Sequence, residues 1–323
     1  MKNSGKYIVV GGAGFIGGHL TRHLVQNTEA EVTVFDNFTS GTRWRLDEVE
    51  NHPRLKVIEG DVKDLPALRA AMQGQDCVYH FAANPDIAKA MTQPDIDFWE
   101  GTYLIQNLIE AMRLEGVTRL IYASGSGVYG DTGETPVHEN YAPLLPISTY
   151  GASKLACEAL ICSYCHMFGL NASAFRFANV VGPRQTHGVA YDFIRRLILA
   201  PKTLQILGDG TQSKSYIHVE DVIAAMRLIE QRGQSGFDFF NAATEDYVTV
   251  REIADMITKR LGLTDVEYEF TGGKRGWKGD VPIVRFNADK IRALGWANRM
   301  SAAEALLDSV DSMIADAKGG KFN

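Results

Sequence analysis

A glycine-rich turn between a strand and a helix is the feature of this sequence that most narrows its fold. The stretch VVGGAGFIGGHL holds Gly11, Gly14 and Gly17 directly after the apolar run KYIVV and at the start of a helical pattern. Glycine permits a tight turn and a close approach of a phosphate group. The N-terminus of the following helix presents N–H groups and a positive dipole end to an anion. The turn therefore predicts a dinucleotide-binding unit.

An acidic residue closes the next predicted strand. The segment EVTVFDN reads as a strand that ends at Asp36, about 20 residues beyond the last glycine of the turn. A carboxylate at this point accepts hydrogen bonds from a ribose diol and repels a 2′-phosphate. Together the turn and the aspartate predict NAD, rather than NADP, as the cofactor.

Strand and helix patterns alternate through the first half of the chain. Short apolar runs such as DCVYHFAA and RLIYASG alternate with segments of helical periodicity, including one continuous helix expected over residues 96–116. Such repeats are typical of a parallel sheet covered on both faces. We expect an α/β fold, a Rossmann-type doubly wound parallel sheet, with residues 1–178 as the NAD-binding domain and later segments returning to it. Residues 179–323 are expected to form mainly a smaller α/β substrate-binding lobe.

Composition argues against several other classes of protein. The chain has 323 residues and a formal net charge of −6, which disfavours a broad nucleic-acid-binding surface. No apolar run reaches the roughly 18–20 residues of a membrane span. The four cysteines include one CxxC but no second pair and no suitable histidine spacing, so we expect no metal site. Unpaired cysteines fit a reducing, cytoplasmic location.

The segment YGASK places a tyrosine one helical turn before a lysine. Tyr150 and Lys154 can therefore lie on one face of a helix. A tyrosine ordinarily has a pKa near 10 and needs nearby positive charge to act as a base near neutrality. A lysine and the positive ring of an oxidised nicotinamide can supply that charge. The same spacing also arises by chance on amphipathic helices. The surrounding motifs must therefore decide whether Tyr150 and Lys154 are a catalytic pair or two unrelated residues.

These motifs resemble, in their order along the chain, those of the extended short-chain dehydrogenase/reductase family. The shared motifs are the glycine turn, Asp36, GDV, HFAA, ASGSGVYGD, Tyr150-x-x-x-Lys154, NVVGPR and GDGTQSKSYIHVEDV. The last two are similar to the NAD-dependent nucleotide-sugar epimerase/dehydratase branch, and the resemblance is closest to enzymes that interconvert UDP-glucose and UDP-galactose. It implies epimerisation of a nucleotide-diphosphate sugar at C4 through a transient 4-keto intermediate, in a homodimer.

The resemblance also implies roles for individual residues. Tyr150 and Lys154 are the catalytic pair. The implied cofactor contacts are Gly11, Gly14, Phe15, Ile16, Gly17, Asp36, Asn37, Asp61, Val62, Phe81, Ala82, Ala83, Tyr150, Lys154 and Phe177. The implied contacts to the substrate diphosphate are Asn179, Lys214 and Arg275. Lys214 stands where relatives usually carry an arginine, so the charge is kept and the bidentate fork is lost.

Three positions depart from the family's pattern. Gly125 stands where members place a serine or threonine whose hydroxyl hydrogen-bonds the sugar oxygen, so we expect Ser124, Ser126 or a water molecule to supply it. Gly127 and its neighbour lack the carboxylate that dehydrating and decarboxylating relatives use, which disfavours both reactions. Phe98 replaces an asparagine that contacts the cofactor in many relatives.

Two alternative functions stay open. One is another NAD-dependent enzyme of the same branch, such as a uronate-sugar epimerase, an oxidase or a reductase. The other is a non-catalytic nucleotide-binding protein, which Gly125 would fit, although the presence of both Tyr150 and Lys154 argues against it.

Overall fold

The computed structural model describes residues 4–233 and 235–321, which form two compact units. Unit 1 comprises the described residues of Met1–Gly125, Thr149–Arg176 and Ile223–Phe240. Unit 2 comprises those of Ser126–Ser148, Phe177–Val222 and Asn241–Asn323. The chain thus passes between the units repeatedly, and residues 126–148 belong to unit 2 although they precede the boundary predicted at residue 178. Which ligand each unit binds stays a prediction.

A seven-stranded sheet forms the centre of unit 1. Its strand order is β12-β7-β5-β4-β1-β2-β3, and every adjacent pair from β7 to β3 is parallel. The strands are β1 (Lys6–Val10), β2 (Glu31–Asp36), β3 (Leu55–Glu59), β4 (Cys77–His80), β5 (Arg119–Ala123), β7 (Asn171–Phe177) and β12 (Phe237–Ala242). Strand order reverses between β1 and β4, which is where doubly wound sheets bind ligands at the carboxyl ends of their strands.

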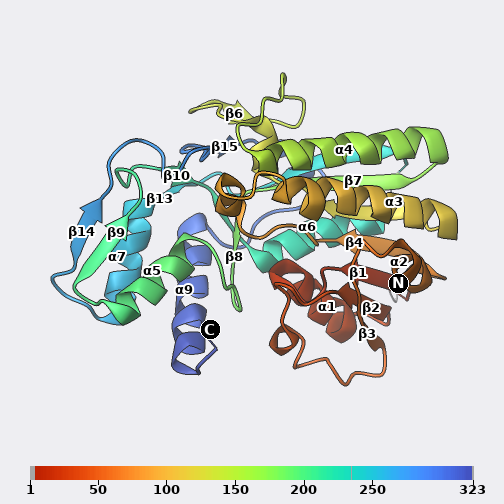
Figure 1. Ribbon diagram of the computed structural model, residues 1–323, viewed down its shortest axis with the longest axis horizontal. Helices are drawn as coiled ribbons and strands as arrows, with labels where there is room; N and C mark the ends of the chain where they lie inside the picture. The colour runs from red at the N-terminus through yellow and green to blue at the C-terminus, as the bar shows by residue number, and fades with distance from the viewer. Residues whose placement is uncertain (1–3, 234, 322–323) are drawn as a thin grey trace. The chain divides into compact units, whose positions relative to one another are not determined.

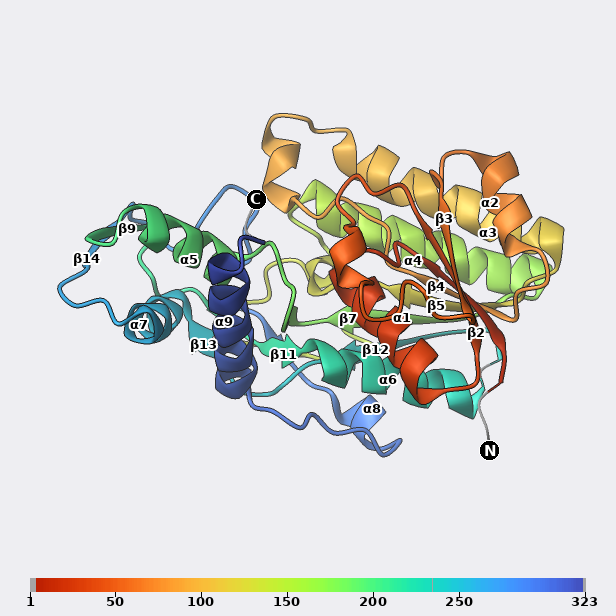
Figure 2. The same ribbon diagram turned by 90° about the horizontal axis from the view of Figure 1, so that it is seen from below.

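Helices cover both faces of this sheet, as Figure 2 shows. Helices α2 (Leu65–Met72), α3 (Tyr103–Glu115) and α4 (Thr149–Phe168) lie on one face, and α1 (Phe15–Asn27) and α6 (Val219–Arg232) lie on the other. Because both faces are covered, Ile8, Val9 and Val10 are all fully buried, which explains the unbroken apolar run of β1. The predicted doubly wound parallel sheet is confirmed.

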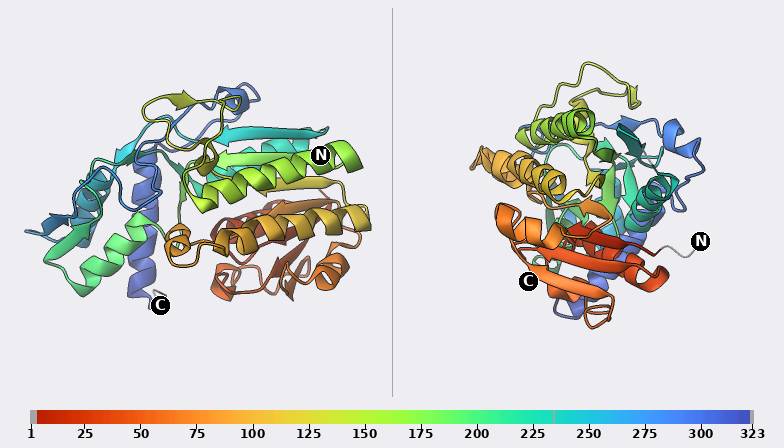
Figure 3. Two further views of the ribbon diagram at one scale, coloured as in Figure 1. Left: turned by 45° about the horizontal axis from the view of Figure 1, so that its top comes forward. Right: turned by 90° about the vertical axis from the view of Figure 1, so that its right-hand side faces the viewer.

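The helix expected over residues 96–116 is interrupted at its start. A π-helical turn, η3 (Phe98–Thr102), precedes α3. Helices α3 and α4 run side by side (Figure 3), and a Cβ at Gly101 would lie 2.4 Å from the Oγ of Ser153 on α4. Thr102 Oγ1 lies 2.9 Å from the same hydroxyl. The wide turn therefore accommodates the serine that precedes Lys154, a constraint that periodicity does not show.

Unit 2 is built from short strand pairs and three packed helices. Strands β9 (Thr203–Ile206) and β14 (Glu267–Phe270) pair in parallel, and helices α5 (Val189–Leu199), α7 (Val250–Leu261) and α9 (Ala302–Lys318) share one apolar core (Figure 1). The other pairs are β8 (Asn179–Val181) with β11 (Tyr216–His218), β10 (Ser213–Lys214) with β13 (Val248–Thr249), and β6 (Pro136–Val137) with β15 (Arg285–Phe286). The short helices of the chain are η1 (Arg43–Arg45), η2 (Ile87–Met91), η4 (Ser126–Tyr129) and α8 (Asp289–Arg292).

Membrane-spanning helices and metal-binding clusters are both absent from the described part of the chain. None of its helices combines the length and the apolar character needed to span a membrane. Within residues 4–233 and 235–321, no three His, Cys, Asp or Glu side chains gather closely enough to hold a metal ion. All four cysteines are free thiols, and burial raises the pKa of Cys77 to about 12 and that of Cys165 to about 11. Both thiols therefore stay protonated, as expected for small apolar core residues.

Candidate active site

The glycine turn is packed too tightly for any other residue. Gly11 has a φ of +78°, and a Cβ there would lie 2.6 Å from the backbone nitrogen of Ala82. A Cβ at Gly17 would lie 2.2 Å from the carbonyl oxygen of Gly11. Helix α1 starts at Phe15 behind Gly14, which offers no capping side chain, and its first turn contains no acidic residue. The turn therefore leaves a helix N-terminus suited to a pyrophosphate, so these residues fit NAD.

Asp36 ends β2 beside this turn. Its Oδ2 accepts a hydrogen bond from the Ala13 N–H and its Oδ1 accepts one from the Phe38 N–H, both at 2.8 Å. Burial raises the pKa of Asp36, while the two backbone N–H groups act in the opposite direction. Because a carboxylate has about four lone-pair sites, two backbone donors leave acceptor capacity for a ribose diol.

The remaining predicted cofactor residues follow β2, β3 and β4. Asn37 donates a 3.3 Å hydrogen bond to Asp61, and Asp61 also accepts one from the Lys63 N–H. Phe81 donates from its backbone to Val10 of β1, so the loop containing Ala82 and Ala83 lies against the glycine turn. Val62 and Phe15 are buried, and Ile16 is partly exposed in the first turn of α1. The structure thus brings these residues together at the carboxyl edge of one sheet.

Tyr150 and Lys154 lie one turn apart on α4. The Lys154 Nζ donates a 2.7 Å hydrogen bond to the carbonyl oxygen of Ala123, at the end of β5. The same nitrogen lies 5.5 Å from the centre of the Tyr150 ring and 5.1 Å from that of Tyr122. Lys154 is buried, whereas Tyr150 is partly exposed. The ammonium is therefore held in place beside a phenol that can still be reached.

His80, which ends β4, is a buried titratable group whose pKa this environment lowers. Burial, followed by the positive charge of Lys154, lowers its pKa to about 3, against one opposing backbone hydrogen bond with Ala82. The folded protein thus keeps the imidazole neutral, while in the unfolded chain a histidine binds a proton below about pH 6.5. Between these pH values the unfolded state binds more protons, so stability falls as the pH falls.

We expect His80→Phe to flatten this pH dependence. Phenylalanine keeps a ring stacked on Tyr122, 6.1 Å away in the wild type, but takes up no proton. Between pH 6 and 4.5, the unfolding free energy should fall less steeply by roughly 1.4 kcal/mol per pH unit. Urea titrations at several pH values measure this slope. His166→Gln, at an exposed position of α4, is the control, and an unchanged slope in His80→Phe would contradict the assignment.

Position 125 lies directly beside the tyrosine. A Cβ at Gly125 would meet only Tyr150 Cε1, at 3.9 Å. Ser124 is committed elsewhere, since its hydroxyl donates a 2.6 Å hydrogen bond to Glu158 Oε1. That carboxylate is also paired with Arg176, with contacts of 3.0 and 2.6 Å. Ser126 begins η4 and belongs to unit 2.

Two of the three predicted diphosphate contacts meet at a buried aspartate in unit 2. Lys214 donates a 2.7 Å hydrogen bond to Asp280 Oδ1, and Arg275 donates to the carbonyl oxygen of the same residue, also at 2.7 Å. Arg275 also forms an ion pair with Asp131, at 2.6 Å. Asn179 is exposed at the start of β8 and pairs in register with Tyr216, two residues beyond Lys214. The structure thus brings the two cations together.

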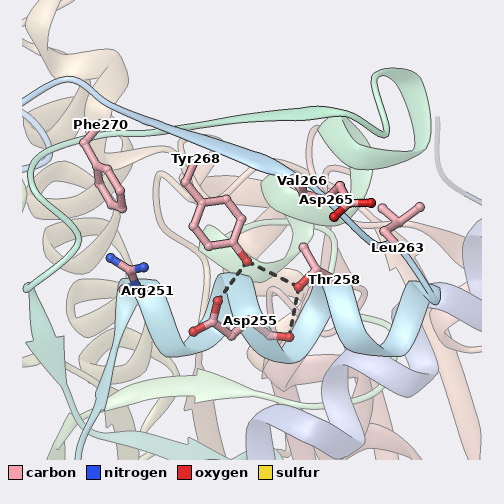
Figure 4. Close-up of a pocket in the computed structure, with 8 residues that line it drawn as sticks. All are labelled: Arg251, Asp255, Thr258, Leu263, Asp265, Val266, Tyr268 and Phe270. Atoms are coloured by element: carbon pink, nitrogen blue, oxygen red, sulfur yellow. Dashed lines mark hydrogen bonds between the residues drawn. The ribbon is translucent and has the colours of Figure 1, made fainter.

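Two further features of unit 2 bear on the assignment. Phe177, implied as a cofactor contact, is buried at the end of β7. A surface groove of about 450 Å³ lies between α7 and β14 (Figure 4), but none of its lining residues is a predicted site residue. Its polar groups pair with one another, as in the hydrogen bond from the Tyr268 hydroxyl to Asp255. We therefore assign no function to this groove.

Sequence reasoning missed several polar residues that organise these sites. Asp97, Asp280, Glu158 and Arg176 are all buried. Two of them had a signal in the sequence: Glu158 continues the four-residue spacing of the catalytic pair, and Arg176 interrupts a buried strand, so each needs a buried partner. The two aspartates gave no comparable signal, because the side chains that bond their carboxylates lie 13 to 66 residues away along the chain.

Comparisons with known proteins agree with this geometry. A model of the NAD dependent epimerase/dehydratase family matches residues 7–243. The chain is 31% identical over 314 residues to a UDP-glucose 4-epimerase of Mycolicibacterium smegmatis, covering 94% of this chain and 97% of that relative. A solved UDP-galactose 4-epimerase gives a TM-score of 0.86 at 36% identity, covering 96% of this chain and 99% of that one.

A third comparison includes the cofactor. The UDP-glucuronic acid 4-epimerase of Bacillus cereus, solved in complex with UDP-glucuronic acid and NAD, gives a TM-score of 0.87 at 26% identity. The alignment covers 96% of this chain and 99% of that one. The predicted family resemblance and the predicted NAD dependence are both confirmed. The match over residues 7–243 and the full-length relatives show that this chain belongs to the NAD dependent epimerase/dehydratase family.

Proposed function

We propose that this enzyme epimerises a nucleotide-diphosphate sugar at C4, with UDP-glucose and UDP-galactose as its substrates. The observation that carries the proposal is the buried Lys154 ammonium, held by Ala123 at 2.7 Å and lying 5.5 Å from the Tyr150 ring. This pair stands in the same unit as the glycine turn and Asp36. Relatives named UDP-glucose 4-epimerase, at up to 31% identity, support the choice of sugar.

In this proposal Tyr150 removes the proton of the sugar 4-hydroxyl and later returns it. Bound NAD supplies a group that accepts a hydride from C4 and gives it back to either face of the 4-keto sugar. Lys154 holds its positive charge beside the phenol and so favours the phenolate. The glycine turn and the first turn of α1 would hold the pyrophosphate through Gly11, Gly14, Phe15, Ile16 and Gly17.

The other implied cofactor residues complete this proposed site. Asp36 and Asn37 would bind the adenosine ribose. The remaining contacts would be those of Asp61, Val62, Phe81, Ala82, Ala83 and Phe177. Two of these, Asn37 and Asp61, are hydrogen-bonded to each other, and this bond joins the loops after β2 and β3.

We propose that Lys214, Arg275 and Asn179 hold the substrate diphosphate. The Lys214 side chain is 25% exposed and that of Arg275 is 43% exposed, so both cations can reach a ligand. Asp280 sets their spacing, because it bonds one through its carboxylate and the other through its carbonyl oxygen. Diphosphate oxygens would replace Asp131 as the partner of Arg275, since two anions cannot share its fork at full strength.

We propose Ser126, rather than Ser124, as the hydroxyl that assists Tyr150. The proton of Ser124 is directed to Glu158 inside unit 1, and its 2.6 Å hydrogen bond is charge-assisted. Water is the remaining source. Turnover that survives Ser126→Ala but not Ser124→Ala would reverse this choice.

We expect Gly125→Ser to raise kcat. The new Cβ would meet nothing closer than Tyr150 Cε1 at 3.9 Å, so a serine fits without displacing the phenol. One added hydrogen bond of about 1 kcal/mol corresponds to roughly a fivefold gain. Steady-state kinetics with UDP-galactose measure it. Gly125→Ala adds the same carbon without the hydroxyl and is the control, and equal rates in the two variants would count against a missing hydroxyl.

We also propose a cytoplasmic homodimer. The residues Phe98, Trp99, Met167 and Phe168 are 51%, 46%, 71% and 44% exposed on η3 and at the end of α4. These exposed apolar side chains, near both ends of α4, are of the kind that a partner chain covers. Light scattering after gel filtration measures the mass, and a monomer at micromolar concentration would contradict the proposal.

The decisive experiment is incubation of the enzyme with single nucleotide sugars, followed by NMR. We expect UDP-galactose and UDP-glucose to interconvert without net reduction of added NAD. Parallel samples contain UDP-N-acetylglucosamine and UDP-glucuronate, because relatives with those substrates are known. Conversion of only one of these would change the substrate assignment. Net NAD reduction, or no conversion of any sugar, would overturn the proposed reaction.

A further inference from the structure

A buried carboxylate outside the predicted site holds the start of α4. Asp97 is 2% exposed, and its Oδ2 accepts a hydrogen bond from Thr149 Oγ1 at 2.7 Å. Its backbone carbonyl oxygen accepts a second bond from Ser153 Oγ, also at 2.7 Å. These two partners immediately precede Tyr150 and Lys154 in the sequence. One residue is therefore bonded to the neighbour of each member of the catalytic pair.

The same carboxylate also reaches the loop after β4. Its Oδ1 accepts a 2.9 Å hydrogen bond from Asn84 Nδ2. Asn84 is 5% exposed and directly follows Ala82 and Ala83, the proposed cofactor contacts. Its side chain is further fixed by two bonds with the backbone of Asp86, at 2.8 and 3.0 Å. Asp97 thus links the helix of the catalytic pair to the loop that lines the cofactor site.

The π-helical turn begins directly after Asp97, and the two residues at this junction differ in burial. Phe98 starts η3 and is 51% exposed, whereas Asp97 just before it is buried. The wide turn also receives the Ser153 hydroxyl, which Thr102 contacts at 2.9 Å. Turns of this kind occur frequently at functional sites. Desolvating a carboxylate costs free energy that ordinary packing does not require, so its burial here calls for a specific use.

We propose that Asp97 is a positioning residue, which sets the placement of Tyr150 relative to the cofactor loop through Thr149 and Asn84. This inference rests on the proposed role of Tyr150 as the base. A displacement of about 1 Å at a reacting group can lower a rate about a hundredfold, so losing one of these bonds should lower turnover without weakening substrate binding.

The test compares Thr149→Val with Thr149→Ser. Valine keeps the shape of threonine without its hydroxyl, and serine keeps the hydroxyl. Because Thr149 is exposed, we expect both variants to fold normally. Thr149→Val should lower kcat for UDP-galactose about tenfold, with KM, NAD content and the midpoint of thermal unfolding unchanged. Thr149→Ser should stay within about twofold of the wild type. Thr92→Val, which removes a hydroxyl that donates to the Lys89 carbonyl oxygen in η2, is the control and should have no effect.

Asp97→Ala supplies a second, stronger test. Alanine removes the carboxylate that accepts from both Thr149 and Asn84, so both side-chain bonds are lost, and kcat should fall about 10- to 100-fold. Wild-type kcat in Thr149→Val, or equal losses in Thr149→Val and Thr149→Ser, would overturn the proposal.

A structural readout separates this inference from the proposed function. Crystal structures of the wild type and of Thr149→Val should differ in the position of the Tyr150 oxygen relative to Lys154 by more than about 0.5 Å. An unmoved phenol would overturn the positioning role. This comparison does not depend on the substrate, so it stays decisive even if the wild-type enzyme converts neither UDP-galactose nor UDP-glucose.

Discussion

Tyr150→Phe should lower kcat for interconversion of UDP-galactose and UDP-glucose by about 10²- to 10⁴-fold, the usual contribution of a positioned acid–base group. The hydroxyl is the only group that the change removes, and Lys154 keeps its 2.7 Å hydrogen bond to Ala123. The variant should therefore fold, bind NAD and bind the nucleotide sugar as the wild type does. NMR of the sugar anomeric protons measures turnover, and absorbance of the purified protein measures NAD content.

Tyr164→Phe provides the matched control on the same helix. The Tyr164 hydroxyl accepts a hydrogen bond from Gln106 and donates one to Glu110, on the surface between α3 and α4. Removing this hydroxyl should leave kcat within about twofold of the wild type, because its partners Gln106 and Glu110 have no proposed role in the reaction. If Tyr150→Phe kept more than a tenth of wild-type turnover, Tyr150 would not be the base, and the proposed mechanism would have to be abandoned.

Arg176→Met should destabilise the protein by about 3–5 kcal/mol, the cost of leaving one partner of a buried ion pair without the other. The side chains of Arg176 and Glu158 are 2% and 5% exposed, and their closest contact is 2.6 Å. Methionine fills part of the space on the Phe239 ring, where the guanidinium lies 4.4 Å from the ring centre. It cannot neutralise the carboxylate. Urea unfolding at pH 7 measures the loss of unfolding free energy.

Two further variants make this prediction specific. Arg113→Met breaks the Arg113–Glu110 pair on α3, whose side chains are 37% and 27% exposed, and should cost far less stability than Arg176→Met. Arg176→Met combined with Glu158→Leu removes both buried charges and should recover most of the lost stability. If the double variant were as unstable as Arg176→Met alone, lost packing rather than an unpaired charge would be the cause.

The Arg176–Glu158 pair also connects stability with the catalytic helix. Glu158 lies one turn beyond Lys154 on α4 and accepts the Ser124 hydroxyl at 2.6 Å, next to Gly125. The double variant loses the hydrogen bond between Ser124 and Glu158, and it leaves neither charge of the Arg176–Glu158 pair unpaired. A fall in kcat at recovered stability would therefore show that the Ser124 bond holds the chain beside Tyr150.

The glycine turn, Asp36 and the Tyr150–Lys154 pair could be predicted from the sequence, because short stretches of chain set the position of each. Gly11, Gly14 and Gly17 act within one turn, and that turn joins a strand to a helix that follow each other directly. Asp36 ends the next strand, so a parallel sheet necessarily brings it to the same edge. Tyr150 and Lys154 share a helix face at one-turn spacing. Each of these placements follows from backbone geometry over a short stretch of chain.

The hydroxyl partner of the tyrosine shows where this reasoning stops. Two serines flank Gly125, and sequence spacing alone treats them alike. The structure distinguishes the two serines, because Glu158, on a helix later in the chain, accepts a 2.6 Å hydrogen bond from the Ser124 hydroxyl. The π-helical turn before α3 is a similar case, since its cause is the Ser153 hydroxyl on a neighbouring helix.

The sequence by itself determined the parallel α/β sheet, the dinucleotide turn, the acidic residue after β2 and the tyrosine–lysine spacing. Tertiary structure alone decided which side chains bond the buried carboxylates: Thr149 and Asn84 bond Asp97, and Lys214 bonds Asp280. The two kinds of feature differ in the distance along the chain over which their causes act. Turn geometry, strand direction and helix periodicity are set by covalent constraints over a few residues, whereas a buried charge is stabilised by groups that only the packing of distant segments brings within hydrogen-bond distance.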